Sequence, residues 1–242
     1  MATNNRPNVT REEILALLCD WKDPWTFGTR CWIQFKRDGN GQLSCDGEQR
    51  SYLAVEFSWS FKNEPSEPRT VQKNIFKANI EITLSPRMHS MYHKSAYWLK
   101  GAALQEHLQN PPPPSEAPFP WAPVHSAAFR PKEYAITLSR GRFIDPGDYW
   151  RKGPYPILQK SSFDLLKPSR YACKLVFDKS PFPPREKWTN DSICTFLDYS
   201  PFYEWKEFVR DSIDARDQTW VETLNLDWWF SPSSGEGYQR NS

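Results

Sequence analysis

Apolar and polar residues alternate along several segments of this chain, and this alternation constrains the fold more than any other feature. A clear example, residues 52–61, carries large apolar side chains at every second position: Leu53, Val55, Phe57, Trp59 and Phe61. A spacing of two is that of a β-strand, whose side chains point alternately to opposite faces. The pattern recurs at residues 31–37, 42–45, 76–84, 134–138, 171–177, 193–199 and 220–230. The sequence therefore predicts about eight strands, each with one buried face.

Eight such strands can bury their apolar faces in two ways. Antiparallel strands can close into a barrel, which leaves no exposed sheet edge, or they can form the two packed sheets of a β-sandwich. We expect a mainly β fold built as an antiparallel barrel of about eight strands, with the sandwich as the alternative. The composition agrees, because 12 Trp, 15 Phe and 10 Tyr stand beside 22 Pro and only 10 Gly. Aromatic residues favour strands, and prolines fall between them.

Two short helices are expected beside the strands. Thr10 and Glu13 form a capping box, and an apolar stripe follows, so we expect a helix over residues 11–19. A second helix is expected within residues 200–218, whose Ser-Pro start is typical of a helix N-terminus.

The remaining segments set the domain organisation. We expect a single barrel domain at residues 10–230, interrupted by helical and proline-rich inserts at residues 86–131 and 141–169. Residues 1–9 and 231–242 are expected to be disordered ends.

No motif in the sequence predicts a metal site or a cofactor. Oxygen-bearing residues alternate from Asp38 to Gly41, as in a calcium loop, but Leu43 and Gln49 occupy the positions where an EF-hand requires glycine and glutamate. We therefore predict a hairpin tip. His89 and His93 are four apart without a third ligand nearby. A Gly-x-Ser-x-Gly elbow, a phosphate loop and a dinucleotide fingerprint are all missing from the sequence.

The charge of the chain and its cysteines indicate which partners and which cellular compartment to expect. The net charge of +2 comes from mixed positive and negative residues, so nucleic acid is not expected as a partner. No apolar run approaches the roughly 20 residues of a membrane span. The five cysteines are odd in number and widely spaced, which predicts reduced thiols in a cytoplasmic protein.

Some of these features resemble the calycin superfamily, which comprises lipocalins and fatty-acid-binding proteins. The resemblance rests on the short helix before the first strand, the early pair Trp25 and Gly28, and the number of strands. The lipocalin order Gly-x-Trp is reversed here, and Thr195, Asp198 and Tyr199 match that family's Thr-Asp-Tyr triplet loosely. The resemblance implies a barrel that encloses one small ligand.

The leading expectation for function is therefore the binding of a small, mostly apolar or weakly acidic molecule inside the barrel. Two alternatives stay open. The cavity could serve a non-hydrolytic enzyme acting on a substrate that resembles a natural product, or residues 110–122 could bind an SH3 or WW domain through their proline run. The sequence leaves open whether the protein catalyses a reaction.

Candidate binding residues follow from the expected strand directions. If the strands run up and down with their apolar faces inward, alternate strands finish at one common end. The candidates for this mouth are Arg37, Trp59, Tyr134, Arg140, Tyr171, Tyr199, Trp220 and Glu222. An inward Arg140 would pair with Glu222 or bind an acidic ligand group. The connection at residues 141–169 leaves from that end and could close it as a lid.

Overall fold

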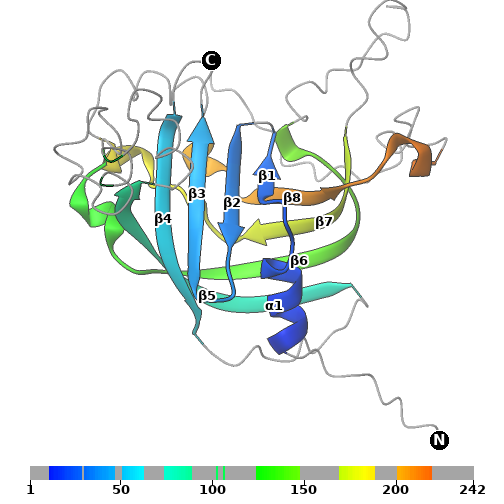
Figure 1. Cartoon of the computed structure of the whole chain (residues 1–242), viewed down its shortest axis with the longest axis horizontal. Coiled ribbons are helices and arrows are strands. Elements are labelled where there is room, and N and C mark those ends of the chain that lie inside the picture. The colour runs from blue at the N-terminus through cyan, green and yellow to red at the C-terminus, as the bar shows by residue number, and fades with distance from the viewer. Residues whose placement is uncertain are drawn as a thin grey trace, which may run out of the picture.

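A computed structural model describes residues 11–28, 30–46, 51–62, 74–88, 102, 106, 124–147, 169–188 and 201–219. Eight antiparallel strands form a closed barrel in chain order, and β8 returns to pair with β1 (Figure 1). The strands are β1 (Trp25–Phe27), β2 (Cys31–Phe35), β3 (Asn40–Asp46), β4 (Ser51–Phe61), β5 (Ile75–Met88), β6 (Lys132–Ile144), β7 (Arg170–Phe177) and β8 (Glu207–Ser212). The predicted mainly β barrel is confirmed.

Helices occupy little of the described chain. The helix α1 (Arg11–Cys19) precedes the barrel as predicted, and within the described residues no helix has the length and apolar character needed to span a membrane. Four short 3-10 helices are η1 (Ser126–Phe129), η4 (Arg185–Lys187), η5 (Phe202–Glu204) and η6 (Ala215–Asp217).

The alternating residues build the core as expected. On β4, the side chains of Val55, Phe57 and Trp59 are buried while Ser58 and Ser60 are exposed. Phe35 of β2 meets the rings of Phe57 and Trp59 edge-on, with centroids 5.3 Å apart in both pairs. The described interior is therefore filled with aromatic and aliphatic side chains.

Two strands differ from those expected. β1 was not predicted, and β8 lies inside residues 200–218, where a helix was predicted; that prediction is wrong. The Ser-Pro start leads only to the single turn of η5, and β8 then pairs with β7 and β1. The expected strands at residues 193–199 and 220–230 lie outside the described residues, as do the expected disordered ends and most of both inserts.

Arg210 on β8 fastens α1 to the barrel. Its side chain is 2% exposed and donates hydrogen bonds to the main-chain carbonyls of Leu17 and Leu18, the latter at 3.3 Å. The guanidinium lies 4.0 Å from the centroid of the Trp25 ring, and the Trp25 indole also donates to Leu18, at 3.2 Å. Such cation–π and charged hydrogen bonds are strong when shielded from water. The end of the helix is therefore fixed against both β1 and β8.

The pairing between β1 and β8 is short, and a separate contact joins the residue after β1 to the segment after β6. A single residue pair, Thr26 with Val209, joins the two strands. Nearby, the buried Asp145 carboxylate accepts hydrogen bonds from the amides of Gly28 and Gly147 at 2.7 and 2.8 Å. Gly28 has a φ of +59°, and a Cβ at Gly147 would stand 2.6 Å from the Gly28 Cα. Both glycines therefore allow the close approach of the turn after β1 to the segment after β6.

The turn from Asp38 to Gly41 is a hairpin tip between β2 and β3, as predicted. The amide of Asn40 donates to Asp38 Oδ1 at 2.9 Å, and the Lys36 amide donates to the Asn40 carbonyl at 2.8 Å. The Trp59 indole donates to the carbonyls of Lys36 and Asn40, both at 3.1 Å. The amide hydrogen bonds to Asn40 hold the pKa of Asp38 below its usual range. The carboxylate thus belongs to the turn.

Gly39 tests this structural role of the turn. Its φ is +83°, and an added Cβ would stand 3.3 Å from the Trp59 carbonyl. We expect Gly39→Ala to lower the free energy of unfolding by about 1–2 kcal/mol, because a side chain disfavours this backbone conformation. Urea denaturation with and without calcium measures the effect, and calcium should change neither protein. A calcium-dependent rise in the melting temperature of the parent protein would refute the structural assignment.

Candidate functional site

The expected mouth lies at the end of the barrel where β2, β4, β6 and β8 finish, hereafter the helix end. Arg37 stands there, but its guanidinium pairs with Asp20 after α1 and with Glu12 on α1, the latter at 2.5 Å. The hydrogen bonds from Arg37 lower the pKa of Asp20. Arg37 is therefore engaged in holding α1, whose buried residues Ile14 and Leu17 belong to the barrel core.

Two other predicted residues also stand toward this end, Arg140 in the last part of β6 and Tyr171 at the start of β7. Arg140 is exposed, but it pairs with the buried Cys173 and the β6–β7 register shifts only after it, between Arg140 and Phe143, so its inward orientation stays a prediction. Trp59 is buried in the core, and Tyr171 is partly buried near the start of β7. The remaining candidates Tyr199, Trp220 and Glu222, and the expected lid beyond residue 147, lie outside the described residues.

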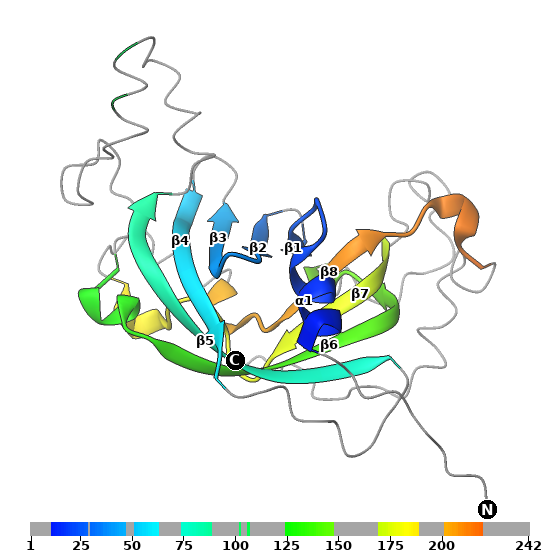
Figure 2. The ribbon, with the colours of Figure 1, turned by 60° about the horizontal axis from the view of Figure 1, so that its bottom comes forward.

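Tyr134 lies away from these residues, beside a pocket of about 570 Å³. The pocket forms where β6 and β8 begin and β7 ends, hereafter the pocket end. In Figures 1 and 2 the start of β6 lies at the left of the barrel and α1 lies to the right of its centre. Its wall consists of Tyr134, Phe182, Pro184 and Tyr203. The size is typical of a site for a small molecule.

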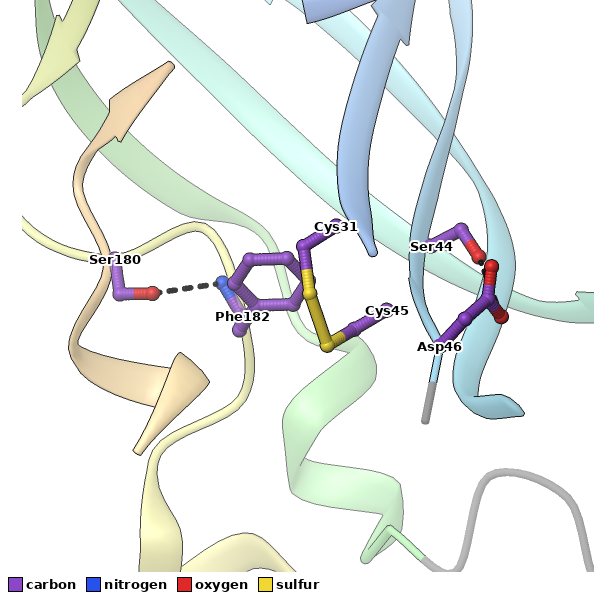
Figure 3. Close-up of a disulfide and its surroundings, with 6 residues drawn as sticks. All are labelled: Cys31, Ser44, Cys45, Asp46, Ser180 and Phe182. Atoms are coloured by element: carbon purple, nitrogen blue, oxygen red, sulfur yellow. Dashed lines mark hydrogen bonds between the residues drawn. A yellow bond between two sulfur atoms is a disulfide. The ribbon is translucent and has the colours of Figure 1, made fainter. Parts of the chain in front are cut away.

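Local hydrogen bonds fix the wall of the pocket. Ser180 Oγ accepts from the amide of Phe182 at 3.3 Å, in the segment after β7 (Figure 3). The Trp188 indole donates to the Pro183 carbonyl at 2.9 Å. Phe202 packs edge-on against both Phe182 and Trp188, with centroids 5.5 and 5.3 Å apart. These contacts hold the Phe182 ring in place before any ligand arrives.

A disulfide between Cys31 and Cys45 lies in the same region as Phe182 (Figure 3). The prediction that all cysteines are reduced is therefore wrong for this pair. The pairing could have been predicted from the sequence, because a hairpin that places Ile33 opposite Leu43 also places Cys31 opposite Cys45. Their Cα atoms are 4.1 Å apart.

Three lysines line the rim of the pocket: Lys132, Lys179 and Lys206. Each stands two residues from an inward-facing ring of its strand, namely Tyr134 on β6, Phe177 on β7 and Phe208 on β8. The sequence analysis missed these lysines. The same period-two pattern that suggested Arg140 would have placed them at the rim, had it been extended in the other direction along the strands.

The rim of the pocket carries more positive than negative charge. Its lining residues include three lysines and one glutamate, Glu204, which leaves a local charge of +2. Lys132 is partly buried, and its pKa is lowered first by burial and then by Lys187 and Lys179. The Lys179 ammonium lies 5.2 Å from the centroid of the Tyr134 ring. The site therefore concentrates positive charge over an aromatic wall.

Tyr134 adds a neutral hydroxyl to the pocket. Burial and the nearby Asp178 carboxylate raise the pKa of its phenol above the usual value. The phenol therefore stays protonated at neutral pH and can donate a hydrogen bond.

The buried charge of Lys132 predicts a particular dependence of stability on pH. Its folded-state pKa lies below the ordinary 10.5, so between the two values the unfolded chain binds more protons, and stability rises with pH. We expect Lys132→Met to be more stable than the parent at neutral pH, with this gain shrinking toward about pH 10. Urea denaturation of both proteins at each pH measures the difference in their free energies of unfolding. Tyr134 titrates in both proteins, so its contribution cancels in this difference. Destabilisation of the variant at neutral pH would be inconsistent with an uncompensated charge.

The described free thiols lie away from the pocket and are unreactive. Burial raises the pKa of both Cys19 and Cys173 to about 12, with further contributions from Asp20 and Asp211 respectively. They are therefore protonated at neutral pH and are poor nucleophiles. In the described ranges no three His, Cys, Asp or Glu side chains gather as metal ligands do, and His89 and His93 fall outside those ranges.

A second hollow, of about 370 Å³, lies beside β4 and β5. It is lined by Asn40, Glu56, Phe57, Ser58, Thr83, Leu84 and Ser85. It has no cationic residue, and Phe57 and Leu84 are core residues of the barrel. The pocket end therefore offers the better combination of apolar wall and charged rim.

Comparison with known proteins gives no relative: no protein-family model, curated protein or solved structure matches this chain.

Proposed function

We propose that the protein binds one small, mostly apolar molecule in the pocket between β6, β7 and β8. The observation that carries this proposal is the pocket of about 570 Å³, with rings from three segments as its wall. Small-molecule sites are typically concave, largely apolar and preformed. The proposed place differs from the expected one, because the pocket lies at one end of the barrel instead of along its axis.

The architecture supports a calycin-like protein as part of the same proposal. Eight antiparallel strands follow one another around the ring, and a short helix covers one end. Trp25, from the pair that suggested the resemblance, joins that helix to β8 through Arg210. These features suit a barrel in which α1 packs against one end and the ligand binds at the other.

The other expectations have less support. Protonated thiols at Cys19 and Cys173 argue against thiol catalysis by these residues. The proline run at residues 110–122 lies outside the described residues, so an SH3 or WW partner stays a prediction. The cytoplasmic location was inferred from reduced cysteines, and the disulfide removes that argument, because disulfides persist in oxidising compartments.

Titration with N-phenyl-1-naphthylamine, a neutral apolar fluorophore, tests the proposed function. We expect saturable binding to the parent and about tenfold weaker binding to Tyr203→Ala, which loses part of the apolar wall. Trp21→Ala is the matched control, because Trp21 is an exposed ring after α1 at the helix end. Failure of the parent to bind, or equal affinities in Tyr203→Ala and Trp21→Ala, would reject this site.

A further inference from the structure

We propose that the pocket recognises an apolar molecule through a doubly charged head group, a phosphate monoester, held by Lys132, Lys179 and Lys206. This inference rests on the proposed function and names the class of its ligand. The three lysines come from the start of β6, the segment after β7 and the segment before β8, which the pairing of these neighbouring strands brings together.

Backbone hydrogen bonds hold these segments in a fixed register. The Asp178 amide donates to the Ala135 carbonyl at 2.9 Å, which joins the end of β7 to the start of β6. The Phe177 amide donates to the Lys206 carbonyl, also at 2.9 Å, which joins the end of β7 to the start of β8. The backbones that carry the lysines are therefore positioned by the barrel itself, as a preorganised site requires.

The pocket lysines differ from other lysines on the barrel in what surrounds them. Lys62 pairs with Glu81 and Glu133, and Lys174 lies 3.7 Å from Glu207. Within the described residues, neither Lys132 nor Lys206 has a carboxylate at ion-pairing distance. A partly buried cation without a partner costs stability, and such costly groups are concentrated at binding sites.

The charged groups that act on Lys132 lie in the segment after β7 and in η4. Lys179 and Lys187 oppose its charge, and Glu186 favours it. An anion bound at the rim would relieve this repulsion, so we expect binding to favour protonated Lys132.

Charge balance and geometry favour a phosphate monoester over a carboxylate. The lining charge of +2 matches a phosphate monoester, which carries a charge of about −2 above its second pKa near 6. Lysine ammonium groups act as point charges and suit phosphate oxygens, whereas carboxylates are best matched by the planar fork of arginine. The rings of Tyr134 and Phe182 would then contact the apolar remainder of the molecule.

Four probes separate charge from apolar contact: 1-naphthyl phosphate, 1-naphthyl sulfate, 1-naphthol and inorganic phosphate. The phosphate and the sulfate share their skeleton and tetrahedral shape but differ by one charge above about pH 6. By calorimetry above that pH we expect the naphthyl phosphate to bind about tenfold more tightly than the sulfate, with naphthol and inorganic phosphate weaker than either. The preference should vanish near pH 5, where the phosphate becomes a monoanion.

Lysine variants test whether the rim of the pocket causes the preference for naphthyl phosphate. Lys132→Met should reduce the affinity for naphthyl phosphate about tenfold and leave naphthol binding unchanged. Lys77→Met, an exposed lysine on the outer face of β5, should bind both probes as the parent does. Lys206→Met provides a second rim variant, with the same result expected.

The outcomes distinguish this inference from the proposed function. Equal affinities for the naphthyl phosphate and sulfate, or unchanged affinity in both rim variants, would overturn the phosphate assignment while leaving apolar binding intact. Tight binding of inorganic phosphate alone would also overturn it, because the site would then recognise a free anion. If neither naphthol nor N-phenyl-1-naphthylamine binds, the proposed function itself fails.

Discussion

Removing the disulfide between Cys31 and Cys45 should lower the free energy of unfolding by about 3 kcal/mol. The bond joins residues 14 apart in sequence, and closing a loop of about 15 residues restricts the unfolded chain by roughly that amount. For a chain of 242 residues, the melting temperature should fall by about 6–12 °C. Reductant should produce this fall in the parent protein.

The double variant Cys31→Ala/Cys45→Ala provides the control for this result. It should melt at the lower temperature whether or not reductant is present, whereas Cys19→Ala, which removes a free thiol, should respond to reductant as the parent does. A parent protein whose melting temperature ignores reductant would contradict the disulfide.

Loss of the Arg210 side chain should have an effect of similar size. Burial lowers the pKa of Arg210 to about 10, so the group is charged at neutral pH. Arg210→Met removes its donors to the carbonyls of Leu17 and Leu18 and its contact with the Trp25 ring. We expect a loss of about 3 kcal/mol, because a charged hydrogen bond and a shielded cation–π contact disappear together.

Arg216→Met is the matched control for Arg210→Met. The side chain of Arg216 is 87% exposed and pairs with Asp214 alongside it, so its removal should change stability little. Hydrogen exchange supplies a second readout, since the amides of α1 should lose protection in Arg210→Met before those of the strands. Equal stability of the two variants would show that Arg210 does not fasten the helix.

The parts of the fold that local patterns determine could be predicted from the sequence. The alternation along β4, the glycine-rich turn after Asp38 and the capped stripe of α1 are each encoded within about ten residues. β1 was missed because three residues are too few to show a period. β8 was missed because its Ser-Pro start is a local helix signal, whereas pairing with β7 is a long-range interaction that prevailed.

The site was harder to predict than the fold. Arg140 was expected at the binding mouth, but the pocket forms at the start of β6, whereas Arg140 stands toward the end of that strand. The lysines of the pocket are far apart in sequence, and the pairing of β6 with β7 and of β7 with β8 brings Lys132 near Lys179 and Lys206. Charge that is dispersed along the chain therefore becomes concentrated at one rim, and the net charge of the whole sequence does not show it.

Nuclear magnetic resonance of the ¹⁵N-labelled parent protein, titrated with 1-naphthyl phosphate, tests the central claim most directly. The account predicts saturable shifts of the amides at residues 132–134, 179–182 and 203–206, which surround the pocket. Amides near Arg37 and Tyr171 at the helix end should stay unchanged. Shifts centred on the helix end, or no saturable shift at all, would contradict binding at the pocket end.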